Sequence, residues 1–388
     1  MPHYPERAGR YERQPGGYRA FIPRDLPPVP PVDLSRLQHL LSSADIALGR
    51  LDGSIQTLPN PDLFVLMYIR KEAVLSSQIE GTQSSLQDLL AAEADIFDPM
   101  APRDVAEVVN YISAMNHGLE RLGQLPLSIR LIREIHAKLL EGARGASLTP
   151  GELRRSQNWI GPANSSLRGA TFVPPPHTHV PDALGALERF LHAEDGVPLL
   201  VRIGLAHAQF ETIHPFLDGN GRVGRLLITF LLCEGSVLRK PVLYLSYFFK
   251  RRRQRYYDLL QAVRDNGDWE EWLTFFLEGV ETVSRQATET AHRVLRLREE
   301  HRDMIASNFG YSAGNGHRVL EKLYRNPIIS VNQVRELTGT TYPAANQLVE
   351  RMVRLGVLAE ITGQARNRRF GYTQYIDLFE DADDGLMA

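Results

Sequence analysis

Twelve consecutive residues hold most of the polar chemistry that the sequence gathers in one place. They run His214-Pro215-Phe216-Leu217-Asp218-Gly219-Asn220-Gly221-Arg222-Val223-Gly224-Arg225, between two stretches of helical apolar spacing. Pro215 ends the preceding helix. Gly219, Asn220 and Gly221 can direct successive backbone amides into one concavity, and such a nest binds phosphate. The helix that begins there adds the positive end of its dipole.

The charged side chains of this segment suit a bound nucleotide. Arg222 and Arg225 are three residues apart, so their forked donors lie on nearly one helix face. Asp218 offers a hard oxygen ligand for Mg²⁺, and His214 can take up a proton near neutral pH. The segment therefore predicts a general base beside a nucleotide. Its candidate nucleotide-binding residues are Gly219, Asn220, Gly221, Arg222, Gly224 and Arg225.

Three other interpretations of these residues are weaker. Asn220-Gly221 is common in hairpin turns, but the flanking patterns are helical rather than alternating. A phosphate loop of the common nucleotide-hydrolase kind requires Gly-Lys followed by Ser or Thr, which the sequence lacks. The Glu-x-x-His spacings at 211–214 and 289–292 are those of di-iron bundles, yet Pro215 breaks the helix directly after His214.

Helical spacing recurs along most of the chain and predicts a mainly α-helical fold. The predicted helices lie within residues 34–50, 62–93, 105–122, 128–141, 182–193, 197–213, 223–234 and 269–304. The segment 158–176 differs, because two short apolar pieces flank a polar stretch and prolines end the second. That pattern predicts a β-hairpin.

Breaks in the helical spacing predict five parts. They are a flexible N-terminal segment (1–33), a helical domain (34–102), a central domain that holds the twelve residues (103–308), a winged helix-turn-helix domain (311–375) and a disordered acidic tail (376–388). A cluster of Gly, Ser and Asn at 308–316 predicts a linker. Beyond it, helical patterns at 331–337 and 343–355 precede two strand patterns, which is typical of a winged helix.

Composition and charge limit the functions that this chain can have. Its 388 residues suggest two or three domains, and 43% apolar with 23% charged residues is typical of a folded protein. A net charge of −2 creates no global attraction to nucleic acid or membrane. The single cysteine, Cys233, excludes an intrachain disulfide and fits a reducing compartment. With no secretory signal and no run of about 18 apolar residues, we expect a cytoplasmic protein without membrane contact.

The twelve residues resemble the signature of the Fic (Fic/DOC) family without a mismatch, and the resemblance extends over most of the chain. It implies an all-helical core with protein adenylyltransferase activity. His214 would deprotonate a Tyr, Thr or Ser hydroxyl of a target protein, or of the chain itself, for attack on the α-phosphorus of ATP. It also implies Asp218 as the Mg²⁺ ligand, residues 219–221 as the anion cradle and Arg225 as the partner of the γ-phosphate. Gly221 favours AMP transfer, because kinases of the related Doc type carry Lys there.

A second motif resembles the inhibitory pattern of this family, which is Ser or Thr, three residues, Glu, then Gly or Asn. Ser76, Glu80 and Gly81 fit it. Taken alone, this spacing would indicate only one helical turn and a helix stop. The resemblance implies that Glu80 pairs with Arg225 and removes the cation that orients the γ-phosphate. A related hypothesis is that Glu80 positions water for the removal of AMP from modified targets.

Two further segments resemble the family less closely. Residues 169–175 resemble its flap, whose edge can bind an extended target by strand addition, so Thr171, Phe172 and Val173 are candidate docking residues. A protective lid is the alternative. The family often carries Asn followed by Arg before paired tyrosines. This chain departs from that pattern and places Arg252 and a second arginine there, so Arg252 is the candidate nucleotide contact.

The predicted winged helix points to a competing class of function. Its presumed wing carries Arg366, Arg368 and Arg369 as candidate DNA contacts. The runner-up function is thus a DNA-binding transcription regulator that senses nucleotide. Winged helices also serve in homodimers or in docking of substrates, and the chain lacks the basic charge of a committed DNA binder. His136, on an apolar helical stripe, is predicted to be a core residue rather than a ligand.

Overall fold

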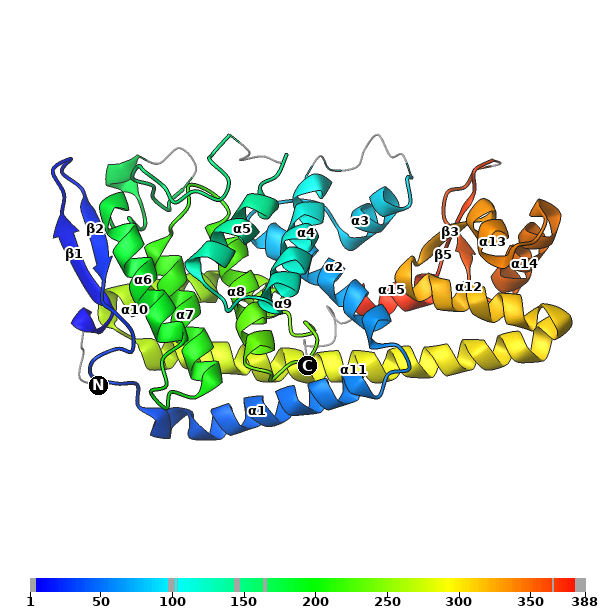
Figure 1. Cartoon of the computed structure of the whole chain (residues 1–388), viewed down its shortest axis with the longest axis horizontal. Helices are drawn as coiled ribbons and strands as arrows, with labels where there is room; N and C mark the ends of the chain where they lie inside the picture. The colour runs from blue at the N-terminus through cyan, green and yellow to red at the C-terminus, as the bar shows by residue number, and fades with distance from the viewer. Residues whose placement is uncertain are drawn as a thin grey trace. The chain divides into compact units, whose positions relative to one another are not determined.

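The computed structural model is mainly helical, as predicted (Figure 1). It describes residues 5–96, 102, 104–142, 147–162, 166–364 and 366–380. The chain divides into two compact units. The first comprises Met1–Gly49, Glu72–Gln83 and Ala106–Ser284, and the second comprises Arg50–Lys71, Ser84–Val105 and Arg285–Ala388. Among the described residues, no helix is long and apolar enough to cross a membrane.

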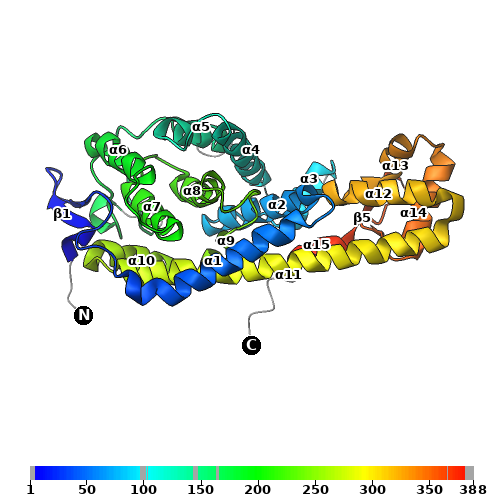
Figure 2. The ribbon, with the colours of Figure 1, turned by 60° about the horizontal axis from the view of Figure 1, so that its bottom comes forward.

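The first unit is built around α7 (Leu199–Ile213) and α8 (Asn220–Glu234), which pack against each other. All but the first residue of α7 are buried, so this helix lies in the interior of the unit. Figure 2 shows α6 beside α7, and α7 beside α8. The surrounding helices are α4 (Val105–Leu122), α5 (Ile129–Leu139), α6 (Val180–Leu191), α9 (Ser246–Arg251) and α10 (Arg253–Asn266). Short 3₁₀ turns lie at Pro5–Arg7, Leu167–Gly169 and His177–His179.

Three long helices contribute residues to both units. They are α1 (Leu34–Gln56), α2 (Pro61–Ile79) and α11 (Trp269–Phe309), the last with 41 residues. The predicted domain boundaries near residues 102 and 308 therefore differ from the compact units. Domain boundaries predicted from sequence follow breaks in the helical spacing. A helix without such a break can still have one part in the first unit and the next part in the second.

The second unit holds a small sheet in the strand order β3-β5-β4, with both pairings antiparallel. The strands are β3 (Ile328–Ser330), β4 (Ala359–Glu360) and β5 (Arg369–Gly371). The helices of this unit are α3 (Leu86–Glu93), α12 (Ala313–Arg325), α13 (Val331–Thr338), α14 (Tyr342–Arg354) and α15 (Thr373–Glu380). A capping box formed by Ser330 and Gln333 begins α13, and Gly339 ends it with a left-handed backbone. The α13–α14 pair and the β4–β5 pair lie where the sequence predicted a helix-turn-helix and its wing.

The N-terminal segment, predicted to be flexible, carries an antiparallel β-hairpin. Its strands are β1 (Gly9–Arg13) and β2 (Arg19–Pro23), with Tyr11 opposite Phe21. Phe21 is fully buried in the first unit. The surrounding Pro, Gly and Arg suggested disorder, but one buried aromatic side chain in a short strand is enough to tie a terminal segment to a core.

Two other expectations need correction in the second unit. The predicted linker at 308–316 is a 3₁₀ turn (Gly310–Ser312) that joins α11 directly to α12. A Cβ on Gly316 would lie 2.7 Å from Ile305 and 2.8 Å from Phe309, so this glycine permits close helix packing rather than flexibility. Residues 376–380 of the predicted disordered tail form the end of α15, with Phe379 buried. Residues 381–388 lie outside the described residues.

Candidate active site

The loop between α7 and α8 has an unusual backbone at both ends. His214 caps the end of α7 with a left-handed φ of +50°, and Gly219 caps the start of α8 with a φ of +75°. The left-handed conformation costs a residue with a Cβ about 1 kcal/mol, so neighbouring groups must hold His214 in place. Asn220 helps to shape the loop, since its amide accepts a bond from the Phe216 N–H and donates one to the Phe216 carbonyl, both 2.8 Å long. Asn220 was predicted from the sequence to bind phosphate, but its side chain bonds the backbone of the loop instead.

His136 supports the same loop from α5. Its ring stacks on Phe216 with centroids 3.7 Å apart. Nδ1 accepts a bond from the Gly151 N–H at 2.8 Å, so Nε2 carries the proton and donates to the Asp218 carbonyl at 3.0 Å. Burial lowers the pKa of His136 to about 4, and the ring is neutral near pH 7. The predicted core histidine therefore also positions the anion loop.

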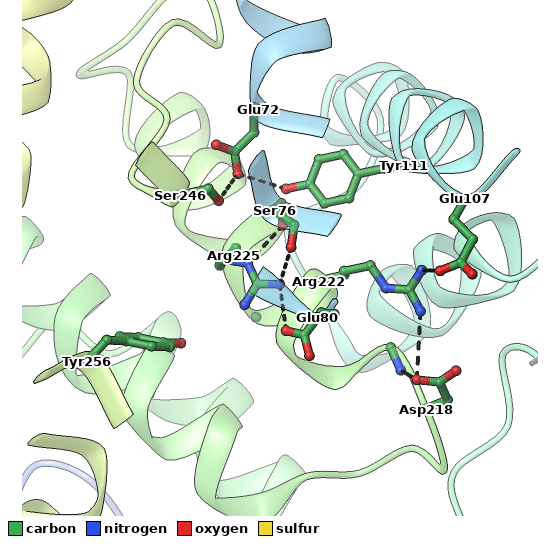
Figure 3. Close-up of polar contacts among 12 residues, drawn as sticks. Glu72, Ser76, Glu80, Glu107, Tyr111, Asp218, Arg222, Arg225, Ser246 and Tyr256 are labelled. Carbon is green, nitrogen blue, oxygen red and sulfur yellow. Dashed lines mark hydrogen bonds and ion pairs between the residues drawn. The ribbon is translucent and has the colours of Figure 1, made fainter. Parts of the chain in front are cut away.

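Figure 3 shows Arg225 held by the end of α2. Its Nε donates to Ser76 Oγ at 2.8 Å, and its Nη2 donates to the Ser76 carbonyl at 3.0 Å and to Glu80 Oε1 at 2.7 Å. Helix α2 ends at Ile79, and Gly81 follows with a left-handed φ of +101°. Burial opposes ionisation of Glu80, but the Arg225 charge outweighs it and lowers the pKa of Glu80 overall. The structure brings the second motif and Arg225 together, as the resemblance implied.

The glycines of the first motif leave room for carboxylates. A Cβ on Gly221 would lie 2.2 Å from Glu80 Oε1, so the Glu80 carboxylate rests directly on the backbone of the predicted anion cradle. A Cβ on Gly224 would lie 2.4 Å from Oε1 of the buried Glu211. At both positions, the lack of a side chain lets a carboxyl group approach the backbone.

Arg222 and Asp218 have different environments, although both were predicted to contact a nucleotide. Arg222 is 2% exposed and donates to Glu107 Oε2 at 3.0 Å, with Asp218 Oδ1 3.7 Å away (Figure 3). Arg222 is thus committed to a buried carboxylate. Asp218 accepts a bond from the Gly219 N–H at 2.7 Å, and 35% of its side chain remains exposed.

Asp218 fits Mg²⁺ bound together with a nucleotide. Mg²⁺ commonly uses one or two carboxylates and completes its shell with phosphate oxygens and water. The described residues contain no cluster of three or more His, Cys, Asp or Glu side chains that could hold a metal alone. A single accessible carboxylate beside the anion cradle suits an ion that arrives with a polyphosphate.

His214 is set up to accept a proton. Its Nδ1 is buried and has no hydrogen-bond partner among the described residues. Burial, followed by the nearby charges of Arg264 and Arg154, lowers the pKa of His214 to about 4. The imidazole is neutral near pH 7, which is the form that a general base requires.

Sequence reasoning missed a polar network on α2. Glu72 Oε1 accepts bonds from the Tyr111 hydroxyl at 3.0 Å and the Ser246 hydroxyl at 2.5 Å, as Figure 3 shows. Burial raises the pKa of Glu72 to about 7. The available signal was the spacing of four between Glu72, Ser76 and Glu80, which places Glu72 and Ser76 on one face of α2 and Glu80 just past its end.

His207 is another residue that sequence reasoning missed. It is buried in α7, and its two ring nitrogens lie 2.9 Å from the Gly224 carbonyl and from the Tyr256 hydroxyl. The carbonyl accepts, so Nδ1 is the protonated nitrogen and Nε2 accepts from Tyr256. Burial lowers the pKa of His207 to about 3. A neutral histidine therefore fixes the first turns of α8 against α10.

The predicted flap is present as one β-bridge between Ile160 and Phe172, and residues 163–165 lie outside the described residues. Phe172 and Val173 are buried, whereas Thr171 is exposed. The Val173 carbonyl accepts a bond from the Phe21 N–H at 2.9 Å. The hairpin β1–β2 therefore already pairs with one edge of the segment that was predicted to dock a target.

The remaining candidate contacts are Arg252 in the first unit and three arginines in the second unit. Arg252 is exposed in the turn between α9 and α10, with its guanidinium 4.2 Å from the Phe248 ring centroid. In the second unit, Arg368 donates to Asn346 at 3.0 Å and Arg369 donates to the Ala94 carbonyl at 3.2 Å. Arg366 is exposed. Two of the three arginines proposed for DNA thus bind groups of this chain.

Comparison with known proteins agrees with this geometry. Residues 38–120 match the Fic/DOC family N-terminal model, and residues 126–232 match the Fic/DOC family model. A protein of Aquifex aeolicus named "probable protein adenylyltransferase" is 34% identical over 97 residues, 25% of this chain and 28% of that protein. Protein adenylyltransferase Fic of Drosophila yakuba is 28% identical over 262 residues, 64% of this chain and 47% of the fly protein. The chain thus spans less than half the length of these curated relatives.

Solved structures share the fold. A Fic family protein from Desulfovibrio desulfuricans superposes with a TM-score of 0.58 at 20% identity, covering 87% of this chain and 95% of the other. A Fic domain containing signaling protein from Bacteroides thetaiotaomicron gives a TM-score of 0.50 at 18% identity, covering 66% of this chain and 95% of the other. With two consecutive family matches and a matching fold, the chain belongs to the Fic/DOC family over residues 38–120 and 126–232.

Proposed function

We propose that this chain is an autoinhibited protein adenylyltransferase, which transfers AMP from ATP to Tyr, Thr or Ser hydroxyls of protein targets and of itself. The observation that carries the proposal is the position of Glu80. Its carboxylate rests on Gly221 and bonds Arg225, so an anion of the chain already occupies the cradle predicted to bind a polyphosphate. The names of the relatives support the choice of AMP transfer.

The proposed reaction uses four features of the first unit. The neutral imidazole of His214 takes the proton from the target hydroxyl, and the hydroxyl oxygen attacks the α-phosphorus of ATP. Backbone amides at 219–221 and the N-terminus of α8 hold the phosphates. Asp218 would hold Mg²⁺, which when bound supplies positive charge beside the leaving pyrophosphate.

Inhibition follows from competition between two anions for one guanidinium. While Glu80 bonds Arg225, the γ-phosphate lacks the cation that should orient it. Ser76 adds two further bonds to the same guanidinium, so the end of α2 holds Arg225 at three points. Displacing Glu80 would leave Arg225 available to the γ-phosphate without moving His214.

Labelled ATP tests the proposal. The Glu80→Gly variant is incubated with ATP labelled at either the α- or the γ-phosphate, alone and with cell proteins. Label is expected to enter protein only from the α-position. The Glu80→Gly/His214→Ala double variant should incorporate none, because removal of a general base commonly slows a reaction by about 10²- to 10⁴-fold. Labelling from the γ-position would instead establish a kinase, and labelling from neither position would exclude transfer.

A further inference from the structure

Arg154 is a buried arginine whose hydrogen bonds surround the backbone of the proposed base. It is 2% exposed. Its Nε donates to the His214 carbonyl at 2.9 Å, and its Nη2 donates to the carbonyls of Ile213, at 3.4 Å, and of Pro175. Its own N–H donates to the Pro215 carbonyl at 2.9 Å. One residue thus bonds three successive residues at the end of α7 and, at Pro175, the flap segment.

Arg154 differs from a buried arginine that is paired with a carboxylate. All acceptors of its guanidinium are backbone carbonyls, and it takes part in no ion pair among the described residues. Burial lowers the pKa of Arg154 to about 10, so the group still carries its charge at neutral pH. A buried cation without a carboxylate is costly, and the carbonyls offset that cost only while the loop keeps this shape.

One acceptor of Arg154 is the carbonyl of His214 itself. His214 has a left-handed backbone, a conformation that neighbouring groups must maintain. Its carbonyl accepts one bond from Arg154 and a second from Asn158 Nδ2 at 3.3 Å, and the same Asn158 amide reaches the Phe216 carbonyl at 2.9 Å. Two side chains from the flap side therefore fix the peptide that follows His214.

We propose that Arg154 is a positioning residue for AMP transfer, which holds the His214 peptide in its left-handed conformation and links it to the flap at Pro175. This inference rests on the function proposed above. Arg154 does not contact the reacting atoms. It acts through the backbone of His214, so its loss misplaces the base while the phosphate cradle stays intact.

The charge of Arg154 has a second, separable effect. The charged groups that act on His214 are Arg264 on α10, Arg154, and Glu80 at the end of α2. The two arginines lower the pKa of His214 and Glu80 raises it. Removing the Arg154 charge should therefore raise that pKa, and activity that needs the neutral imidazole should be lost at a higher pH as the solution is acidified.

Four substitutions in the Glu80→Gly background separate these effects. Arg154→Lys keeps the charge and removes the forked donors, whereas Arg154→Met removes both. Asn158→Ala removes the other donor to the same carbonyl. Arg155→Met is the matched control, because Arg155 is 87% exposed and, within the described ranges, forms an ion pair with Glu152 alone. AMP transfer is measured from α-labelled ATP as kcat and as KM for ATP, between about pH 3 and 9 so that the range includes the His214 pKa of about 4, with thermal melting recorded for every variant.

We expect kcat to fall about tenfold or more in both Arg154 variants and in Asn158→Ala, with KM for ATP changed less than about twofold, because small misplacements of a catalytic group cost up to about 100-fold. The acid limb of the pH profile should move to higher pH in Arg154→Met and stay in place in Arg154→Lys. Arg155→Met should match its parent. Unchanged kcat in folded Arg154→Lys would overturn the proposal, and unchanged kcat in folded Arg154→Met would do so if Arg154→Lys fails to fold.

A measurement without turnover separates this inference from the proposed function. The imidazole of His214 is followed by NMR across pH, with its signal assigned by comparison with His214→Ala. Its pKa is expected to rise in Arg154→Met and to stay constant in Arg155→Met. If Glu80→Gly transfers no AMP, the proposed function fails, while this titration still tests whether the charge of Arg154 acts on His214. An unchanged His214 pKa in folded Arg154→Met would refute the effect of its charge.

Discussion

Replacing Glu80 with glycine is expected to raise self-modification of the chain by about 10- to 30-fold. The lost contact is the bond between Glu80 Oε1 and Arg225 Nη2, which is 2.7 Å long. Hydrogen bonds to charged groups contribute about 1.5 to 3 kcal/mol. Because 35% of the Glu80 side chain is exposed, solvent screening favours the lower part of this range. About 1.5 to 2 kcal/mol corresponds to the stated increase, at about 1.4 kcal/mol per tenfold.

A graded series sharpens this prediction. Glu80→Gln keeps the size of the side chain and can still accept a bond from Arg225, but it lacks the charge. A neutral hydrogen bond contributes about half as much as a charged one, or about 0.75 to 1 kcal/mol here, so Glu80→Gln should activate by roughly 3- to 5-fold. Initial rates of incorporation from α-labelled ATP, at equal protein and ATP concentrations, provide the comparison.

The matched control is Glu152→Gln, which removes a surface carboxylate paired with Arg155 at 3.1 Å. It should leave the rate unchanged, because exposed ion pairs contribute little. Equal rates for wild type, Glu80→Gln and Glu80→Gly would refute the inhibitory role of Glu80. A rate that rises with Glu152→Gln as well would show that general loss of negative charge, rather than the Arg225 contact, controls activity.

Three predictions concern stability. Gly224→Ala forces a Cβ to within 2.4 Å of Glu211 Oε1 and should lower the free energy of unfolding by about 1 to 3 kcal/mol, measured by denaturant titration. Glu107→Ala leaves Arg222 buried beside an empty partner site and should cost about 3 kcal/mol, whereas a loss below about 1 kcal/mol would show that water replaces the carboxylate. Glu72 has a folded pKa raised to about 7, above its ordinary value near 4.5, so its stabilising contribution is complete below pH 4.5 and lost as the pH rises through 7. Wild type should therefore be more stable relative to Glu72→Gln at pH 5 than at pH 8, and a difference independent of pH would contradict the shifted pKa.

Local patterns in the sequence determined the position and the type of the main site. The residues that shape the anion loop are contiguous, and their backbone preferences act within a few bonds. Gly219 is left-handed and Asn220 begins α8, close to where the motif predicted a loop and a helix start. Ser76 and Glu80 are about one helical turn apart, and Gly81 follows where α2 has ended. Helical geometry therefore predicted that the two side chains point in the same direction. Helical spacing likewise predicted a helix within residues 197–213, where α7 lies.

Only the tertiary structure decided the partner of each charged side chain. Arg222 and Arg225 look equivalent in sequence, yet Arg222 binds Glu107 while Arg225 binds Ser76 and Glu80. A guanidinium pairs with whichever acceptor packing brings within about 3 Å, and that acceptor can lie more than 100 residues away along the chain.

The same reason explains the contacts that sequence reasoning missed. Burial and distant partners give Arg154, His136 and His207 their roles, and none of these is encoded by nearby residues. The N-terminal hairpin is a further case. The composition of residues 1–33 suggested disorder, but Phe21 is buried and its N–H bonds the Val173 carbonyl. Spacing along the chain fixes what a short segment can become, whereas packing between segments fixes which groups meet.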